Sequence, residues 1–429
     1  MRLIETSGRG ARRAAETIAA LEARGRRSLE GVLPVVRRIV TNVRRNGDRP
    51  LLKYAKKLDG LRDASALRIG EDEMAAAWGA CDAEMRAALM TAAEQIREFA
   101  RIQMPESWKS EPVAGLTTGQ LVRPLDAVGC YVPSGRHPLP STLLMTAIPA
   151  QVAGVERIVV VSPKPARETL AAAHLLGICE FYRVGGAHAV AALAYGTEMI
   201  ARVDKIVGPG NLYVTAAKRE VAFDCAIDML AGPTEIVVAS ERGSAAEIAS
   251  DLVAQAEHDP EALAIFITTR KKLAEAVIAE TKARARANAV AREALKRNGV
   301  VIVAASLREA RELVNRIAPE HLTVDSAADL VWVRNAGSVF VGCWSAQPMG
   351  DYISGPNHTL PTGGLARVRG GLSANDFVKL ITVQEYDAAA IGELGPKAVL
   401  LAEAEGLTAH AEAVRVRLKS ALRGRKKNG

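Results

Sequence analysis

Residues 155–196, VERIVVVSPKPARETLAAAHLLGICEFYRVGGAHAVAALAYG, decide the fold class of this chain. Two short runs rich in β-branched and aromatic residues each end in a tight turn of Gly, Pro or Ser, and each turn leads into an apolar stretch of helical length. A strand, a turn and a helix in repeated succession are typical of a parallel sheet with helices on both faces. The sequence therefore predicts an α/β fold.

The same alternation extends toward the C-terminus. Further strand-like runs, most of them followed by a helical stretch, lie at 203–210, 234–240, 262–269 and 300–305. So many strands, interrupted by the turn-rich segment 123–150, favour two sheets over one. We expect two Rossmann-like α/β domains, each built on a parallel sheet.

The two ends of the chain have a different pattern. Residues 1–110 place apolar residues at three- and four-residue spacing, as in VLPVVRRIVTNVRR (32–45), which predicts helices. After about residue 343 we expect no further strands, because 350–372 form a long Gly- and Pro-rich loop and 387–423 are again helical in pattern. Loops of that length in compact domains usually carry function.

Composition excludes several classes of protein. With 429 residues, 49% of them hydrophobic, and a mean hydropathy of +0.06, the chain is globular rather than disordered. The five cysteines are scattered and form no CxxC pair, so we expect neither a disulfide framework nor a thiolate zinc cluster. No apolar run reaches the ~18 residues of a membrane span, and the N-terminus lacks the apolar core of a signal peptide. We expect no membrane association and a cytoplasmic location.

The net charge of +8 is concentrated at the two ends of the chain. Residues 1–50 carry twelve Arg against five acids, and residues 411–429 carry seven Lys or Arg against one Glu. Surfaces that bind nucleic acid usually combine basic residues with stacking aromatics, and 411–429 contain no aromatic residue. We therefore favour a solvated basic tail without a nucleic-acid partner. A non-catalytic, nucleic-acid-binding protein is the alternative.

Four segments combine a histidine with a nearby acid or amide: Gln255 with His258, Asp351 with His358, Glu320 with His321, and Glu405 with His410. A mixed nitrogen and oxygen shell drawn from them suits zinc or a similar divalent ion, whereas ordinary surface or core histidines are the alternative. Glu320 and His321 suit water activation and general-base catalysis. Adjacent residues point apart on a helix or a strand, however, which favours an ordinary boundary pair.

Two glycine-rich turns, Gly185-Gly186 and Gly208-Pro209-Gly210-Asn211, follow predicted strands and open helices. Their backbone N–H groups are suited to holding a pyrophosphate. Neither turn is a complete GxGxxG pattern, and Pro209 removes one donor. An ordinary α/β turn therefore remains the alternative.

Five separated segments, in their order and spacing, resemble those of one enzyme family. They are VDKIVGPGN (203–211), AQAEHDP (254–260), IAPEHL (317–322), MGDYISGPNHTLPTGG (349–364) and LAEAEGLTAHAEAV (401–414). Together they make the chain similar to histidinol dehydrogenase from about residue 20 to residue 420. The resemblance implies zinc- and NAD-dependent oxidation of L-histidinol to L-histidine through L-histidinaldehyde, the last two steps of histidine biosynthesis.

The resemblance also implies roles for individual positions. His321 matches the family's general base and Glu320 matches the residue that activates water. The one zinc ion per subunit would be held by Gln255, His258, Asp351 and His410. Positions that contact the cofactor correspond to Tyr131, His188 and Asn211. Positions that contact the substrate correspond to Thr234, His358 and Glu405, together with Gln255, His258, His321, Asp351 and His410.

One position departs from the family pattern, which commonly has Gln where this chain has His188. An imidazole still donates one hydrogen bond, but its reach differs from that of an amide, which puts the cofactor contact in doubt. The alternative is a tolerated substitution in a surface loop. His137 and His174 match no functional position, and we expect both to be structural.

The family forms intertwined homodimers, in which the C-terminal region of one chain completes the partner's site. By resemblance we expect four regions: an N-terminal helical segment (1–22), a larger α/β domain with the metal and base residues (23–127 with 235–372), a smaller α/β domain that binds NAD (128–234), and a C-terminal helical segment (373–429). A paralogous zinc- and NAD-dependent dehydrogenase acting on another alcohol is the alternative within enzymes. The presence of Glu405 and His358 argues against it, because such a paralogue would lose the substrate-side residues.

Overall fold

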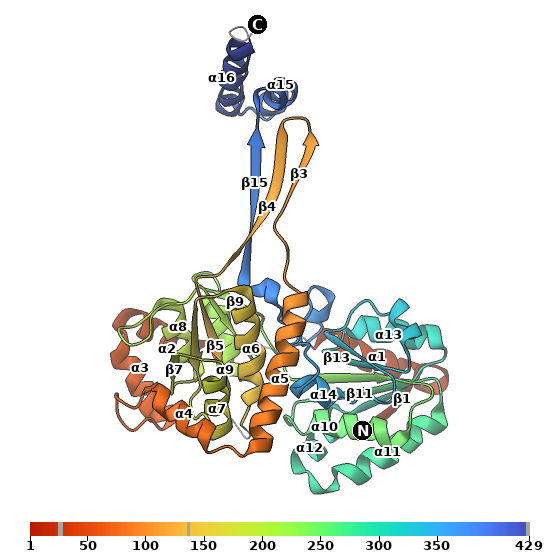
Figure 1. Ribbon diagram of the computed structural model, residues 1–429. Helices are drawn as coiled ribbons and strands as arrows, with labels where there is room; N and C mark the ends of the chain where they lie inside the picture. The colour runs from red at the N-terminus through yellow and green to blue at the C-terminus, as the bar shows by residue number, and fades with distance from the viewer. Residues whose placement is uncertain (25–28, 135–137, 426–429) are drawn as a thin grey trace. The chain divides into compact units, whose positions relative to one another are not determined.

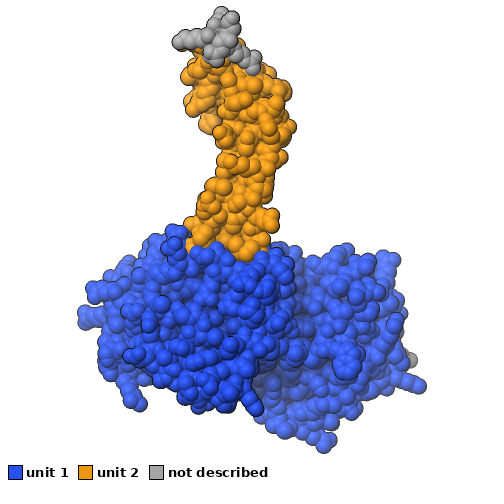
Figure 2. Space-filling model, in the orientation of Figure 1, with its two compact units in different colours: residues 1–103, 126–377 blue, residues 104–125, 378–429 orange. Residues whose placement is uncertain are grey.

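The computed structural model describes residues 1–24, 29–134 and 138–425, and Figure 1 shows its helices and strands. The chain divides into two compact units, residues 1–103 with 126–377 and residues 104–125 with 378–429, which are coloured separately in Figure 2. His137 and the last four residues of the basic tail lie outside the described residues. Each of the five cysteines is free. Among the helices described, none is long and apolar enough to cross a membrane.

The first sheet of the larger unit, called here the β10 sheet, is parallel throughout. Its strands, in spatial order, are β1 (Arg2–Glu5), β12 (Val300–Val303), β11 (Leu263–Thr268), β10 (Glu235–Ala239), β13 (His321–Val324) and β14 (Ser338–Val341). One face packs on α10 (Ala245–Ala256), α11 (Lys271–Arg284) and α12 (Ala289–Asn298), and the other on α1 (Ala11–Ala23) and α13 (Leu307–Ile317). Burial on both faces explains why strands such as β11 are apolar at nearly every position.

The second sheet of the larger unit, called the β5 sheet, is parallel except for one short edge strand. Its strands, in spatial order, are β2 (Arg68–Ile69, antiparallel), β7 (Glu180–Tyr182), β6 (Arg157–Val161), β5 (Ala127–Tyr131), β8 (Lys205–Val207) and β9 (Ala226–Ile227). One face packs on α2 (Leu33–Asn46), α3 (Asp48–Tyr54), α8 (Gly186–Tyr195) and α9 (Leu212–Val221). On the other face lie α6 (Pro140–Ala153) and α7 (Arg167–Leu175), with α5 (Ala83–Ile102) against α6 and α4 (Glu71–Gly79) against α7.

Apart from their outermost strands β1 and β2, the two sheets have the same strand order. In each, the chain adds two strands on one side of a central strand and then crosses to its other side. The crossing leaves a switch point between β10 and β13 in one sheet and between β5 and β8 in the other. Open α/β sheets usually bind their ligands outside the carboxyl ends of the strands at such a point.

The smaller unit joins residues that are distant in the sequence. Strands β3 (Trp108–Val113), β4 (Leu116–Pro124) and β15 (Val378–Tyr386) form an antiparallel sheet in the order β15-β4-β3. A helical hairpin of α15 (Ala388–Ala404) and α16 (Thr408–Arg425) follows β15. The Asp387 carboxylate accepts the N–H groups of Ala389 and Ala390 and thereby caps the first turn of α15.

The predicted α/β fold with two parallel sheets is confirmed, but three details of the prediction are wrong. Residues 1–22 are not helical throughout, because β1 completes the outer edge of the β10 sheet. Strands do not stop after residue 343, because β15 pairs with β4 over nine residues. The segment 23–127 does not belong wholly with 235–372, because α2, α3 and β2 pack in the β5 sheet rather than the β10 sheet. A short strand at a sheet edge leaves little periodic signal in the sequence.

Candidate active site

The predicted catalytic residues lie at the amino end of β13, beside the amino end of the neighbouring strand β10. Glu320 immediately precedes β13 and His321 is its first residue, paired in register with Ile236 of β10. The His321 side chain is 4% exposed and the Glu320 side chain 8%. Their closest nitrogen and oxygen atoms, His321 Nδ1 and Glu320 Oε2, are 3.6 Å apart. The expectation that these adjacent side chains point apart is therefore wrong, because the chain enters the strand between them.

The hydrogen bonds of His321 determine which ring nitrogen is free. Nδ1 lies 3.0 Å from the carbonyl oxygen of Glu235. A carbonyl only accepts, so Nδ1 carries the proton and donates it. In the neutral ring Nε2 then holds the lone pair, and this buried atom has no hydrogen-bond partner among the described residues. The ring is thus oriented as a base whose accepting atom is unoccupied.

Glu320 is held by two donors on one of its carboxylate oxygens. Its Oε2 accepts the hydroxyl of Thr234 at 2.6 Å and the N–H of Glu235 at 2.7 Å. Burial raises the pKa of Glu320, although His321 and these two donors lower it. Burial lowers the pKa of His321, but the nearby carboxylates of Glu320 and Asp351 outweigh it and leave that pKa raised. The pKa of Glu320 is thereby raised to about 7 and that of His321 to about 9, so the base form of His321, with Nε2 free, becomes populated as the pH rises above neutrality.

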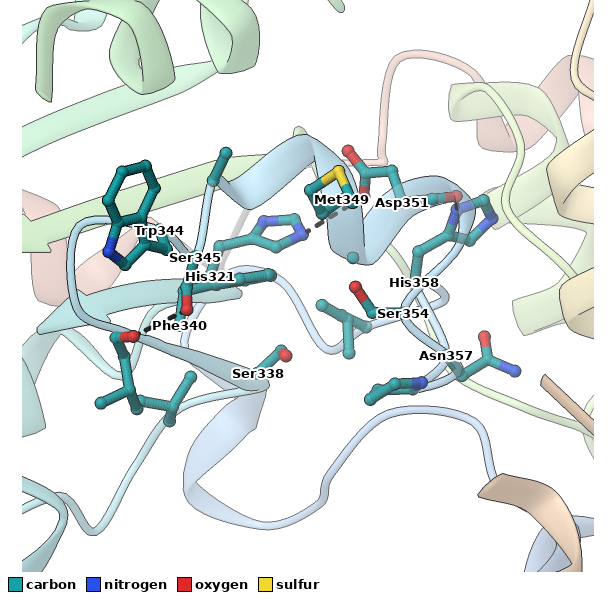
Figure 3. Close-up of a pocket in the computed structure, with 16 residues that line it drawn as sticks. His321, Ser338, Phe340, Trp344, Ser345, Met349, Asp351, Ser354, Asn357 and His358 are labelled. Atoms are coloured by element: carbon teal, nitrogen blue, oxygen red, sulfur yellow. Dashed lines mark hydrogen bonds and ion pairs between the residues drawn. The ribbon is translucent and has the colours of Figure 1, made fainter. Parts of the chain in front are cut away.

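Asp351 and His358 reach the same site from the segment that was predicted as a loop. Asp351 lies instead on a short helix, α14 (Gln347–Tyr352), and its Oδ1 is 3.8 Å from His321 Nε2. His358 Nδ1 donates to the carbonyl oxygen of Asp351 at 2.8 Å, and burial lowers the pKa of His358. His321, Asp351 and His358 line a cavity of about 400 Å³ together with Ser338 of β14 (Figure 3).

Gln255, the predicted amide ligand of the metal ion, has an oriented side chain. The Thr234 hydroxyl gives its only hydrogen to Glu320, so Thr234 Oγ1 accepts from Gln255 Nε2. The amide oxygen of Gln255 is then turned away, buried, and has no hydrogen-bond partner in the described part of the chain. An unpartnered buried amide oxygen fits the role of a metal ligand.

The other predicted metal ligands on a histidine side chain, His258 and His410, are exposed. His258 is exposed and lies two residues beyond the end of α10, so it does not share a helix face with Gln255. Burial raises the pKa of Asp351, but the nearby histidines outweigh this effect and leave that pKa lowered. His321 makes the largest contribution, and His258 is near enough to add to it. His410, on α16, and Glu405, at the end of α15, are exposed residues of the smaller unit. Within the described residues, no three His, Cys, Asp or Glu side chains form a preformed metal cluster.

The predicted cofactor residues Tyr131 and Asn211 lie at the switch point of the β5 sheet. Tyr131 ends β5, and Asn211 caps α9 by accepting the N–H groups of Tyr213 and Val214. Asn211 also lines a cleft of about 610 Å³ whose other walls include Thr234 and His258. The structure therefore brings a predicted cofactor residue, a predicted substrate residue and a predicted metal ligand to one cleft.

His188 is not in a surface loop, so that alternative is wrong. It lies on α8, is 1% exposed, and its Nε2 is 2.8 Å from Asp59 Oδ2. The same carboxylate oxygen accepts the N–H of Gly185, and the Tyr131 hydroxyl accepts the N–H of Gly186. These two donors are already used within the protein, so the Gly185-Gly186 turn does not offer them to a pyrophosphate.

Sequence reasoning missed Glu235, which supports both catalytic candidates. Its backbone binds His321 and Glu320, while its buried carboxylate binds Arg24 through two hydrogen bonds of 2.7 and 2.5 Å and accepts the N–H of Gly363 at 2.9 Å. The available signal was a charged residue at the start of an otherwise apolar strand, because a buried carboxylate requires a partner.

Comparison with known proteins gives a consistent family. The profile of histidinol dehydrogenase matches residues 22–418. The histidinol dehydrogenase of Geobacillus kaustophilus is 48% identical over 392 residues, which are 89% of this chain and 92% of the relative. That of Methanothermobacter thermautotrophicus is 46% identical over 416 residues, 94% and 97% of the two chains. The crystal structure of histidinol dehydrogenase from Elizabethkingia anophelis matches with a TM-score of 0.91 at 35% identity, covering 98% of each chain.

Proposed function

The chain belongs to the histidinol dehydrogenase family, and from this we propose that it oxidises L-histidinol to L-histidine in two NAD-dependent steps at a zinc-containing site. It is an oxidoreductase of histidine biosynthesis by family; the cofactors, the site residues and the two-step course are the proposal. We further propose that it acts in the cytoplasm. The observation that carries the proposal is the buried Glu320–His321 pair, whose free Nε2 is oriented by the Glu235 carbonyl.

In the first step His321 removes the proton of the substrate hydroxyl. Its Nδ1–H stays bound to the Glu235 carbonyl, so the imidazolium that forms at Nε2 remains in place beside Glu320 and Asp351. Their negative charges stabilise the positive ring. Asn211 and the cleft that it lines would hold NAD, which would supply the hydride acceptor for this step.

In the second step the aldehyde is hydrated and oxidised again. Glu320 takes a proton from the attacking water, because its raised pKa makes the carboxylate a stronger base than an ordinary Glu. After its first proton has passed to solvent through the cavity that it lines, His321 removes the proton of the hydrate as it did that of the alcohol. The two oxidations release four electrons in total, which requires two NAD molecules.

Gln255, His258 and Asp351 would hold the zinc ion, with His410 as a further ligand. A zinc ion held there would supply a Lewis acid with affinity for nitrogen donors such as those of histidinol, and His321 would act on the substrate hydroxyl. The unpartnered amide oxygen of Gln255 is the feature of this chain that fits such an ion. Because His410 and Glu405 are exposed in a single chain, we propose that they complete the site of the partner in an intertwined homodimer.

A coupled count tests the proposal. With zinc-loaded protein, we expect two NADH per L-histidinol consumed and histidine as the product. Chelation should abolish the reaction, and zinc should restore it. No NADH from histidinol in protein that binds zinc, with turnover of another alcohol, would instead assign the chain to a paralogous activity.

A further inference from the structure

The turn between β8 and α9 follows a path that depends on glycine. Gly208 has φ = +109°, and a Cβ placed there would stand 2.2 Å from the carbonyl oxygen of Tyr131. A Cβ on Gly210 would stand 2.4 Å from a methyl carbon of Val214. The turn therefore runs directly against the end of β5 and the first turn of α9, and neither glycine leaves room for a side chain.

A buried ion pair holds this turn from the inside. The N–H of Gly208 donates to Asp228 Oδ2 at 2.7 Å, and the carbonyl oxygen of Gly208 accepts from Lys218 Nζ at 2.5 Å. Lys218 Nζ also binds Asp228 Oδ1 at 2.6 Å. Both polar groups of one peptide residue are thus bound by the two members of a single pair.

The pair is almost completely removed from water. The Lys218 side chain is 4% exposed and the Asp228 side chain 1%. An isolated buried ion pair is rarely more stable than apolar side chains of the same size, so its burial is weak evidence for added stability, and its contacts with the turn are the feature to be explained. Those contacts are made with Gly208.

The turn held by the Lys218–Asp228 pair forms part of the wall of the cleft. Gly210 and Asn211 line the cavity that Thr234 and His258 also line, and Asn211 is the N-cap of α9. Lys218 lies on α9 itself, and Asp228 lies six residues before Thr234 in the connection from β9 to β10. The pair therefore links the turn to α9 and to the β9–β10 connection, and both of these segments contribute residues to the cleft.

The other glycine turn of the β5 sheet has a similar arrangement. Asp59 accepts the N–H of Gly185 and is paired with His188 on the helix that follows, just as Asp228 accepts the N–H of Gly208 and is paired with Lys218. At both turns the N–H of the first glycine donates to a carboxylate, and that carboxylate is paired with a basic side chain on the next helix. The recurrence indicates that holding these turns is a feature of the sheet.

We propose that the Lys218–Asp228 pair positions the Gly208–Asn211 turn for the dinucleotide, so that both are positioning residues for NAD. The inference rests on the proposed function, in which NAD binds at this cleft. It predicts that breaking the pair weakens cofactor binding while leaving the histidinol side of the site intact.

The test measures NADH binding by fluorescence titration of the full-length protein, together with the KM for NAD, the KM for histidinol and thermal unfolding. Wild-type protein is measured first, because absence of NADH binding in the wild type would overturn the proposed function rather than the role of the Lys218–Asp228 pair. In Lys218→Met we expect the dissociation constant for NADH to rise about tenfold or more, since small displacements of a positioning group are costly. The KM for histidinol should change less than twofold.

The double variant Lys218→Met with Asp228→Asn separates positioning from stability. It removes the unpaired buried charge, so the unfolding temperature should recover relative to Lys218→Met, but Met cannot bind the Gly208 carbonyl. NADH affinity that stays low in this variant supports the proposal. Affinity that recovers together with stability would overturn it, because the pair would then only stabilise the fold.

Arg157→Met is the matched control in the same sheet. Arg157 on β6 binds Glu180 on β7 and the carbonyls of Ala201 and Arg202, at the amino edge of the β5 sheet and away from the turn. It should lower the unfolding temperature without changing NADH affinity. An equal loss of affinity in this control and in Lys218→Met would show that general destabilisation causes the effect.

Discussion

The β10 and β5 sheets have the same central strand order but place their candidate functional residues at opposite edges. In the β5 sheet, Tyr131 and Asn211 lie at the carboxyl ends of β5 and β8, at the switch point. In the β10 sheet, Glu320 and His321 lie at the amino ends of the strands, away from the carboxyl edge at its switch point. Strand order therefore agrees with the proposed nucleotide site but does not locate the proposed catalytic groups, which must be found from their own chemistry.

At the carboxyl edge of the β10 sheet, where open α/β sheets usually bind a ligand, an aspartate binds the protein's own turn. Asp325 follows β13, and its carboxylate accepts the hydroxyl of Ser240. It also accepts the N–H of Glu241 at 2.8 Å, and the two bonds hold the turn after β10. The acid at this edge thus serves the turn. A cavity of about 220 Å³ beside it is lined by Asp325, Ser240 and Asp251.

The largest effect that tests this comparison is expected at the amino edge. His321→Asn should lower kcat by about 10²–10⁴, the usual contribution of a general base, while the amide preserves the fold. Because neighbouring carboxylates raise the pKa of His321, wild-type turnover should increase with pH above neutrality, and the variant should lose this dependence. Steady-state rates from pH 6 to 10 check both; a variant with the wild-type profile would remove His321 from the mechanism.

Glu320→Gln should affect mainly the second oxidation. The amide oxygen can still accept from Thr234 and from the N–H of Glu235, so the local structure is kept while the base is lost. We expect histidine to form roughly 10²-fold more slowly than in the wild type. The first NADH should therefore be released faster than the second. A stopped-flow trace with two equally fast NADH equivalents would contradict the assigned role.

Asp325→Ala should change stability and leave catalysis intact. Two hydrogen bonds to a charged group are lost, so the free energy of unfolding should fall by about 1–3 kcal/mol in a urea titration. The KM values and kcat of the folded protein should match those of the wild type. A selective rise in either KM would show that this edge also contacts a ligand.

Asp251→Asn should have the smallest effect, and its sign should depend on pH. Burial raises the pKa of Asp251 from 3.8 to about 6, although a backbone N–H donated by Gln347 lowers it. The folded state thus holds the proton more tightly, so this group stabilises the protein below pH 4 and loses that contribution as pH rises through 6. After allowance for solvent exposure, the variant should be about 1 kcal/mol more stable at pH 8 and unchanged at pH 4. Urea titrations at the two pH values measure this, and equal stabilities at pH 8 would contradict the shift.

Sequence pattern predicted the elements that repeat and missed those that depend on distant partners. The strands around 159 and 265 were evident because burial on both faces makes them apolar throughout. Strand β15 was missed because it is largely exposed and is specified by its pairing with β4. Periodicity records burial, and an exposed strand has little of it.

For the site, spacing and resemblance named the residues, while the hydrogen bonds that orient them are visible only in three dimensions. The protonated nitrogen of His321 follows from the Glu235 carbonyl, and Glu235 lies 86 residues away in the sequence. The pairing of His188 with Asp59 spans 129 residues. No local rule connects positions so far apart, and a one-dimensional pattern therefore gives identity without orientation.

The pairing of β4 with β15 has a consequence for synthesis of the chain. Roughly 250 residues separate the two strands, and translation adds about 5–20 residues per second, so β4 waits on the order of 10–50 s after leaving the ribosome for its partner. During that interval the edge of β4 that later binds β15 offers its backbone groups to any other strand. In the sequence, β4 lies between the two segments of the larger unit, 1–103 and 126–377. Most residues of the larger unit are therefore synthesised while β4 waits for β15. The smaller unit is therefore expected to form last on the ribosome, and chaperones or fast translation of residues 126–377 should limit its misassembly.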